Sequence, residues 1–140
     1  MFPLSLLAFA IVSLGARPAA SVDGSGTITF GSSVEHISVT ASGNSGRATF
    51  EDKAAGGNVN GQIDINCVNV SGTTATLSGL VTHSNKKSMI GQEGVFRVVD
   101  NGSRGSDEAS LINFHQPGTS TDCNAGEFDL TQVKGNFTVR

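Results

Sequence analysis

Apolar and polar residues alternate with a period of two through most of the chain after residue 20. In residues 59–67, the apolar side chains would share one face of a strand, and Gln62, Asp64 and Asn66 would share the opposite face. Similar alternation recurs every 10 to 15 residues, and no later segment has the spacing of a helix. The pattern predicts eight or nine short strands and an all-β protein.

Turn-forming residues separate these predicted strands. Residues 42–46 and 71–73 are rich in Gly, Ser, Asn and Thr, and Asp100-Asn101-Gly102 interrupts an apolar run sharply. We expect Asn101 and Gly102 to supply the positive φ of a sharp turn. The Asp100 carboxylate would then accept backbone N–H bonds within that turn.

Short strands without helices predict either a barrel or a sandwich. Glycines at four positions inside predicted strands favour a small antiparallel β-barrel, because barrel strands need bends and bulges. A β-sandwich is the alternative, but the chain has no tryptophan, which immunoglobulin-like sandwiches usually carry in the core. The four glycines are Gly61, Gly79, Gly94 and Gly135.

The first twenty residues resemble a secretory signal peptide. Residues 2–16 are apolar except for two serines, and small residues at 19–21 suit cleavage. The apolar run is shorter than the ~20 residues of a membrane span. We expect residues 1–20 to be a signal peptide and residues 21–140 to form a single β-barrel domain of a secreted, extracellular protein; a buried N-terminal helix is the alternative.

Composition excludes several classes of protein. Charged residues make up 15% of the chain and the net charge is −3, whereas disordered chains combine high charge with few apolar residues. The 18 glycines occur with only 3 prolines and no collagen period. The acidic balance argues against nucleic acid or an anionic membrane as the partner.

The two cysteines predict one structural disulfide. Cys67 and Cys123 would most simply pair with each other in an oxidising compartment. With only two cysteines and no CxxC, a zinc site built on thiolates is excluded. We expect no cofactor.

Residues 67–82, Cys-Val-Asn-Val-Ser-Gly-Thr-Thr-Ala-Thr-Leu-Ser-Gly-Leu-Val-Thr, and residues 96–102, Phe-Arg-Val-Val-Asp-Asn-Gly, carry a resemblance to a known family. The chain is similar to small secreted or cell-envelope β-proteins of bacteria and fungi. Their pattern runs C-x-x-V-x-G-x-x-A-x-x-x-G-x-V-T, then V-x-D-N-G, then a second cysteine. The resemblance spans about residues 25–139. It implies the fold and secretion, and it implies no activity.

No pattern of catalytic residues is present. The chain lacks G-x-S-x-G, HExxH and an EF-hand loop, so we expect no catalytic residues and no enzyme activity. His36, His83 and His115 could converge as metal ligands in a barrel enzyme. The interpretation we favour is three surface or loop histidines.

Two pairs of adjacent acids also stand out. Glu51-Asp52 and Asp107-Glu108 would point to opposite faces of a strand, so we interpret both pairs as solvated turn charges rather than two-carboxylate sites. Asp100 and Asp107 are weak candidates for a calcium site, against which we favour a turn with a flexible loop.

Three sequons could carry N-linked glycans. They are Asn69-Val-Ser, Asn101-Gly-Ser and Asn136-Phe-Thr. We rank Asn101 first because its turn should be exposed, and Asn69 second.

These features favour a secreted, non-enzymatic protein that interacts with a host or a cell surface, in the manner of an effector. Its partner would be an extracellular or surface molecule that the sequence does not identify, and the sequence predicts no oligomeric state. One alternative is a carrier that holds a small apolar ligand inside the barrel, where Ala48, Gly61, Ala75 and Gly79 would leave room. The other is a small barrel enzyme that uses the histidines.

Overall fold

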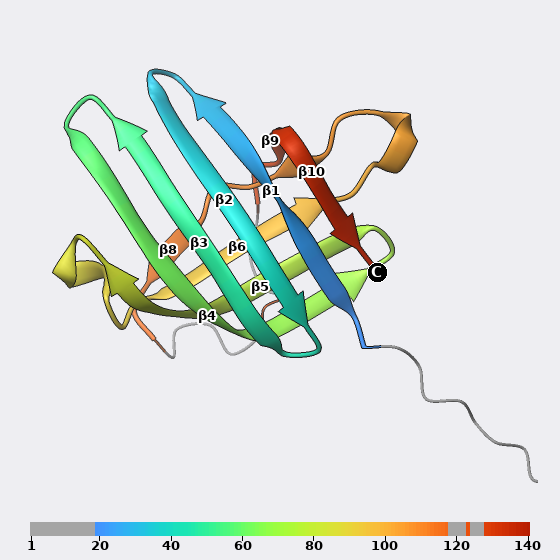
Figure 1. Cartoon of the computed structure of the whole chain (residues 1–140), viewed down its shortest axis with the longest axis horizontal. Helices are drawn as coiled ribbons and strands as arrows, with labels where there is room; N and C mark the ends of the chain where they lie inside the picture. The colour runs from blue at the N-terminus through green and yellow to red at the C-terminus, as the bar shows by residue number, and fades with distance from the viewer. Residues whose placement is uncertain (1–18, 118–122, 124–127) are drawn as a thin grey trace, which may run out of the picture.

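The computed structural model describes residues 19–117, 123 and 128–140, so the predicted signal peptide lies almost entirely outside the described residues. Ten described strands form one antiparallel sheet, with two 3-10 helices in its loops (Figure 1). No helix among the described residues is long and apolar enough to cross a membrane. The elements are β1 (Ser21–Phe30), β2 (Ser33–Ser42), β3 (Ser45–Ala54), β4 (Gly57–Ser71), β5 (Thr74–Ser84), η1 (Lys87–Met89), β6 (Glu93–Val99), η2 (Gly102–Arg104), β7 (Glu108–Ala109), β8 (Asn113–His115), β9 (Thr131–Gln132) and β10 (Lys134–Val139).

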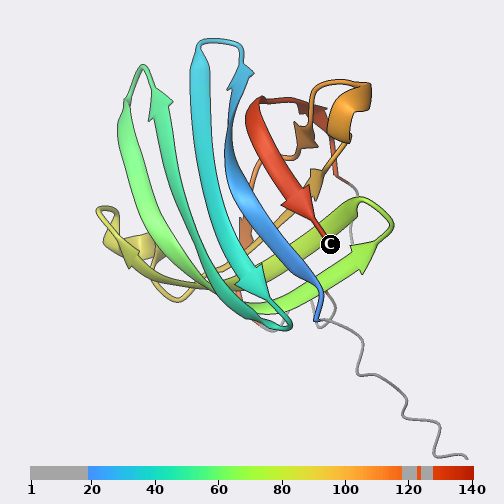
Figure 2. The same ribbon diagram turned by 45° about the vertical axis from the view of Figure 1, so that its right-hand side comes forward.

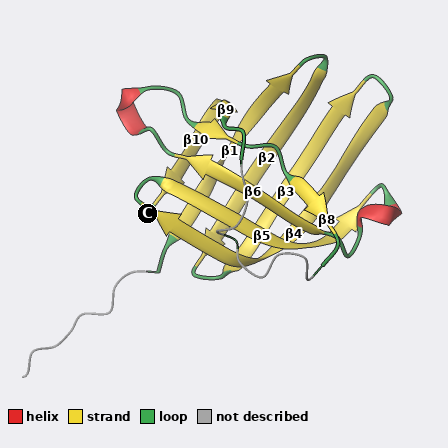
Figure 3. Cartoon of the chain, turned by 180° about the vertical axis from the view of Figure 1, so that it is seen from behind, coloured by secondary structure: helices red, strands yellow, loops and turns green. Residues whose placement is uncertain are grey.

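The sheet curls into a nearly closed barrel (Figure 2). Its strand order is β10-β1-β2-β3-β4-β5-β6-β7-β9, with β8 also paired to β6. Seen from behind, β5 and β6 cross in front of β1 to β3, so that two parts of one sheet enclose the core (Figure 3). The structure confirms the predicted barrel and not the alternative, a β-sandwich. The expectation of eight or nine short strands is wrong in number and length, because ten strands are described, β1 to β3 have 10 residues each and β4 has 15.

A two-residue turn fixes the pairing of β2 with β3. Gly43 and Asn44 form the turn, and Gly43 has φ +60°, which a residue without Cβ adopts at no steric cost. Counting back from the turn along both strands places Glu35 directly opposite Asp52. This register brings two carboxyl groups to one point inside the barrel.

Bends in β4 and β5 let the sheet close. The pairing of β4 with β5 shifts register twice, as β-bulges do. Gly79 lies against this bend, and a Cβ there would collide with the carbonyl oxygen of Asp64. The ring of Phe50 fills the space beside Gly61, where a Cβ would come within 2.6 Å of the ring. At both glycines another part of the chain comes too close to leave room for a Cβ, as expected where strands bend.

Apolar side chains fill the barrel interior. Small residues contribute to this packing: Ala48 and Ala75 are fully buried, and Ile63 and Ile112 lie against Gly94. The largest side chains that are almost completely buried come from β1, β2, β4, β5, β6 and β10: Val22, Ile28, Ile37, Val39, Ile63, Leu77, Val81, Phe96, Val98 and Phe137. The small residues thus let neighbouring groups approach closely.

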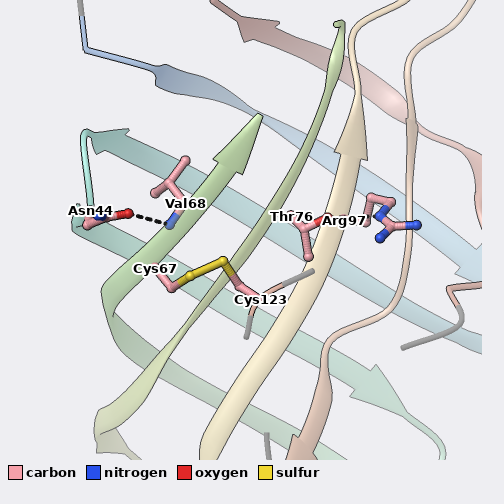
Figure 4. Close-up of a disulfide and its surroundings, with 6 residues drawn as sticks. All are labelled: Asn44, Cys67, Val68, Thr76, Arg97 and Cys123. Carbon is pink, nitrogen blue, oxygen red and sulfur yellow. Dashed lines mark hydrogen bonds between the residues drawn. A yellow bond between two sulfur atoms is a disulfide. The ribbon is translucent and has the colours of Figure 1, made fainter. Parts of the chain in front are cut away.

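The predicted disulfide joins Cys67 on β4 to Cys123, with 6.0 Å between their Cα atoms (Figure 4). It lies on the same outer face as Arg97, whose Nε donates to Thr76 Oγ1 at 2.9 Å. The Arg97 guanidinium stacks on the ring of Phe128 at 4.4 Å from the ring centre. The disulfide and this stack together tie Cys123 and Phe128 to the outside of β4 to β6.

Candidate functional site

A groove with a volume of about 610 Å³ lies on the outer face of β2 to β5. Eight of its eleven lining residues carry polar side chains, and Ile90 contributes an exposed apolar one. The lining residues are His36, Thr49, Phe50, Glu51, Asn60, Gly61, Gln62, Thr82, His83, Ser84 and Ile90.

Two imidazoles in the groove are each held by a threonine. His36 Nδ1 lies 2.9 Å from Thr27 Oγ1, and His83 Nδ1 lies 3.2 Å from Thr82 Oγ1. Neither Nε2 atom has a partner among the described residues. Each ring is therefore oriented through one nitrogen and can bond a ligand through the other.

The two histidines are too far apart to share a metal ion. His36 is on β2 and His83 on β5, three strand spacings away, or roughly 14 Å along the sheet at about 4.8 Å per strand. His115 is on β8 and does not line this groove. In the described part of the chain, no three His, Cys, Asp or Glu residues could hold a metal. The structure thus brings two of the three histidines to one groove without making them converge.

Hydrogen bonds also order the rest of the groove. Gln62 Nε2 donates to Asp64 Oδ1 at 3.2 Å, and the Thr82 hydroxyl donates to the same oxygen at 3.4 Å. The Ser84 hydroxyl donates to the carbonyl oxygen of Asn60 at 2.7 Å, so it is not aligned with an imidazole as a catalytic nucleophile would be. The groove presents fixed hydrogen-bonding groups to a ligand.

The turn at Asp100 is partly as predicted. Asp100 Oδ1 accepts the backbone N–H of Gly102 at 2.9 Å, so the predicted turn cap is confirmed. Only Gly102 has positive φ, at +56°; the expectation for Asn101 is wrong, because its φ is −88°. Asp100 Oδ2 also accepts the backbone N–H of Val139 at 3.1 Å, which ties this turn to β10.

Asp107 is buried, so its interpretation as a solvated turn charge is wrong. Its exposed fraction is 3%. Oδ1 accepts the N–H of Asn101 at 2.9 Å, and Oδ2 accepts the N–H of Phe137 on β10 at 2.7 Å. The Asp107 carbonyl oxygen accepts the N–H of Val133 at 3.0 Å. We call this junction between residues 100–107 and β10 the seam of the barrel.

Backbone N–H groups at the seam account for the positions of the Asp100 and Asp107 carboxylates without a calcium ion. All four carboxylate oxygens of Asp100 and Asp107 accept backbone N–H groups, whose positive ends would face a cation.

We expect Asp100→Ala to lower the free energy of unfolding by about 1–2 kcal/mol, because two backbone donors lose their acceptor. Thermal unfolding in millimolar calcium and in excess EDTA should give one melting curve for the unmutated protein. A calcium-dependent rise abolished by this substitution would contradict that interpretation.

The pair Glu51-Asp52 points to opposite faces, as expected, but Asp52 is half-buried with one carboxylate oxygen out of contact with solvent. Glu51 lines the outer groove and lies 3.5 Å from Lys53 Nζ. Asp52 faces inward, directly opposite Glu35 on β2. Asp52 Oδ1 is buried and has no partner among the described residues. Burial first, and then the hydrogen bond and negative charge of Asp52, raise the pKa of Glu35 to about 9.

The pairing of Glu35 with Asp52 was not expected from the sequence, although the sequence carries a signal for it. Glu35 continues the inward-facing series of Ile37 and Val39, and Asp52 continues that of Phe50. An acid at an inward position of an alternating strand is unusual enough to single out.

The sequons differ in their surroundings. Asn101 is half-buried, and its Nδ2 donates to the carbonyl oxygen of Ser106 at 2.8 Å and to Glu108 Oε2 at 3.2 Å. The turn that follows it is exposed over residues 102–106, as expected, but the Asn101 side chain is held by these two bonds. Asn136 is exposed on β10, and Asn69 is half-buried on β4. Glycosylation at all three stays a prediction.

Comparison with protein-family models, curated proteins and solved structures finds no match to this chain.

Proposed function

We propose that the protein is a secreted, non-enzymatic binding module that recognises an extracellular or cell-surface partner through the groove on β2 to β5. The observation that carries this proposal is the contrast between the two faces of the sheet. The inner face is covered by closely packed apolar side chains, whereas the outer groove holds oriented polar groups with unused bonding capacity.

The dimensions of the groove favour an extended ligand. It crosses four strands, so His36 and His83 lie roughly 14 Å apart along the sheet and would contact different parts of the same ligand. Between them, Glu51, Asn60 and Gln62 offer a carboxylate and two amides. Such a set can bond the donors and acceptors of a short segment of a partner.

The two alternatives have less support. A carrier needs space inside the barrel, but Phe50 fills the space beside Gly61, and Ile63 and Ile112 lie against Gly94. A histidine-based enzyme needs an imidazole aligned with a nucleophile or a metal, and the contacts of His36 and His83 are with threonines instead.

Blocking the groove tests the proposal. We expect Thr49→Arg to weaken binding of the fluorescently labelled secreted protein to its partner by roughly tenfold or more, equivalent to about 1.4 kcal/mol. Thr49 is exposed and lines the groove, so an arginine there would occupy the ligand's space. Binding would be measured on intact cells, extracellular proteins and purified cell-surface glycans.

Thr40→Arg is the matched control, because Thr40 is an exposed threonine on the outer face of neighbouring β2 and does not line the groove. It should bind as the unmutated protein does. Equal binding by both variants would reject the groove as the site. An apolar compound recovered by solvent extraction of the purified protein, without surface binding, would favour the carrier instead.

A further inference from the structure

Glu35 on β2 forms a hydrogen bond with a segment of the chain that pairs with β6. Its exposed fraction is 3%, and its Oε1 accepts the backbone N–H of Ile112 at 3.0 Å. The two residues are 77 positions apart in the chain. Glu35 is on β2, whereas Ile112 lies between β7 and β8, which both pair with β6. This bond therefore joins parts of the sheet that no strand ladder joins directly.

Residues 110–115, which we call the strap, lie over the core. The strap is fixed to β6 at both ends, through Ser110 and through the pairing of β8. Between these ends, the Ile112 N–H bonds to Glu35. Ile112 packs in the core, and the ring of Phe114 lies 5.0 Å from the ring of Phe50. Displacing the strap would uncover apolar side chains of the barrel interior.

A hydrogen bond between the facing carboxyl groups of Glu35 and Asp52 requires a proton. Two carboxylates have four acceptor oxygens and no donor, so they attract each other only while one of them is protonated. With the proton on Glu35, one oxygen accepts the Ile112 N–H and the hydroxyl donates to Asp52. Without the proton, the buried Glu35 would carry a negative charge opposite that of the half-buried Asp52, whose Oδ1 already lacks a partner among the described residues.

The other charged groups nearby point away from this pair. β1 places Ile28 opposite Glu35, β3 places Asp52 opposite it, and the strap contributes a backbone N–H. Asp52 is thus the titratable group facing Glu35 among the described residues. The neighbours on the same two strands, His36, Glu51 and Lys53, lie on the outer face of the sheet.

We propose that Glu35 and Asp52 form a proton-dependent latch: while the two carboxyl groups share a proton they hold the strap across the end of the barrel, and loss of the proton releases it. This role is independent of the outer groove. It makes the barrel most tightly closed in acidic surroundings and uncovers the Phe50–Phe114 contact in alkaline ones.

The direction of the pH effect follows from the raised pKa of Glu35. In the unfolded chain this group titrates near its ordinary value of 4.5, and in the folded protein near 9. The folded protein therefore holds the proton more tightly over the interval between these values. The stabilisation is fully present below the lower value and is lost as pH rises toward and through the higher one.

Hydrogen exchange of the Ile112 amide tests the latch. In the unmutated protein, we expect its protection factor, corrected for the intrinsic pH dependence of exchange, to be about tenfold or more lower at pH 9.5 than at pH 6. Glu35→Gln should keep the same protection at both pH values, because glutamine can accept from Ile112 and donate to Asp52 without titrating. Asp52→Asn should also prevent the loss, because it removes the second charge.

Glu51→Gln is the control, since it changes the adjacent acid on the outer face; this variant should lose protection at alkaline pH as the unmutated protein does. Protection of Ile112 that does not change with pH in the unmutated protein would overturn the latch. So would an equal loss in Glu35→Gln and Asp52→Asn. A parallel loss at the core amide of Val39 would show general unfolding, and would also overturn local release of the strap.

Discussion

Asp107→Ala is expected to lower the free energy of unfolding by about 3–5 kcal/mol, at the upper end of the range for single substitutions. The side chain is buried, and its two oxygens accept N–H groups from Asn101 and Phe137. Removing it leaves two donors unpaired at about 1–3 kcal/mol each and opens a cavity where β10 meets the rest of the barrel. Urea unfolding followed by circular dichroism measures the change.

Asp23→Ala provides the comparison for this loss, because Asp23 is an exposed aspartate on β1. It should change stability by no more than about 0.5 kcal/mol. Asp107→Asn should fall between the two, since the amide retains one acceptor oxygen but turns an NH₂ group toward a backbone donor. A cost below 1 kcal/mol for Asp107→Ala would mean that the seam contributes little to stability.

Removing the disulfide in the double variant Cys67→Ala/Cys123→Ala is expected to cost about 4 kcal/mol. The cysteines are 56 positions apart, and in the chain-entropy model a crosslink of that span stabilises by about this amount by restricting the unfolded chain. Urea unfolding of the oxidised protein and of the double variant gives the difference.

The unmutated protein under reducing conditions is the control for the disulfide, and it should unfold at the same urea concentration as the double variant. A difference between these two would point to the alanines themselves. The prediction would be contradicted if reduction left the unfolding midpoint of the unmutated protein unchanged.

The alternation of apolar residues predicts the barrel because each face of a strand is set locally. The inward series on β2 and β4 and the turn glycines are visible in the sequence. The disulfide follows from there being only two cysteines. Strand lengths are less predictable, because strands continue past the polar residues that end the alternating pattern. β5, for example, extends to Ser84 through residues that look like a loop.

The contacts of the buried acids were harder to anticipate. The pair of Glu35 and Asp52 could have been found by counting back from the turn at Gly43, since a hairpin register is a local property. The bonds of Asp107 to Phe137 and of Glu35 to Ile112 join residues 30 and 77 positions apart. These bonds depend on how strongly the sheet curls, and the alternation of apolar and polar residues along a strand does not determine that curvature. The outer groove depends on the same curvature.

The seam has a consequence for association between molecules. β10 is at one end of the strand order, and an edge strand with unpaired N–H groups can recruit a strand from another chain. In this protein, the carboxylates of Asp100 and Asp107 already accept the N–H groups of Val139 and Phe137 along that edge. An approaching strand would have to displace two charged acceptors before it could bond. The acids that complete the barrel therefore also make this edge a poor template for intermolecular sheets and fibre growth.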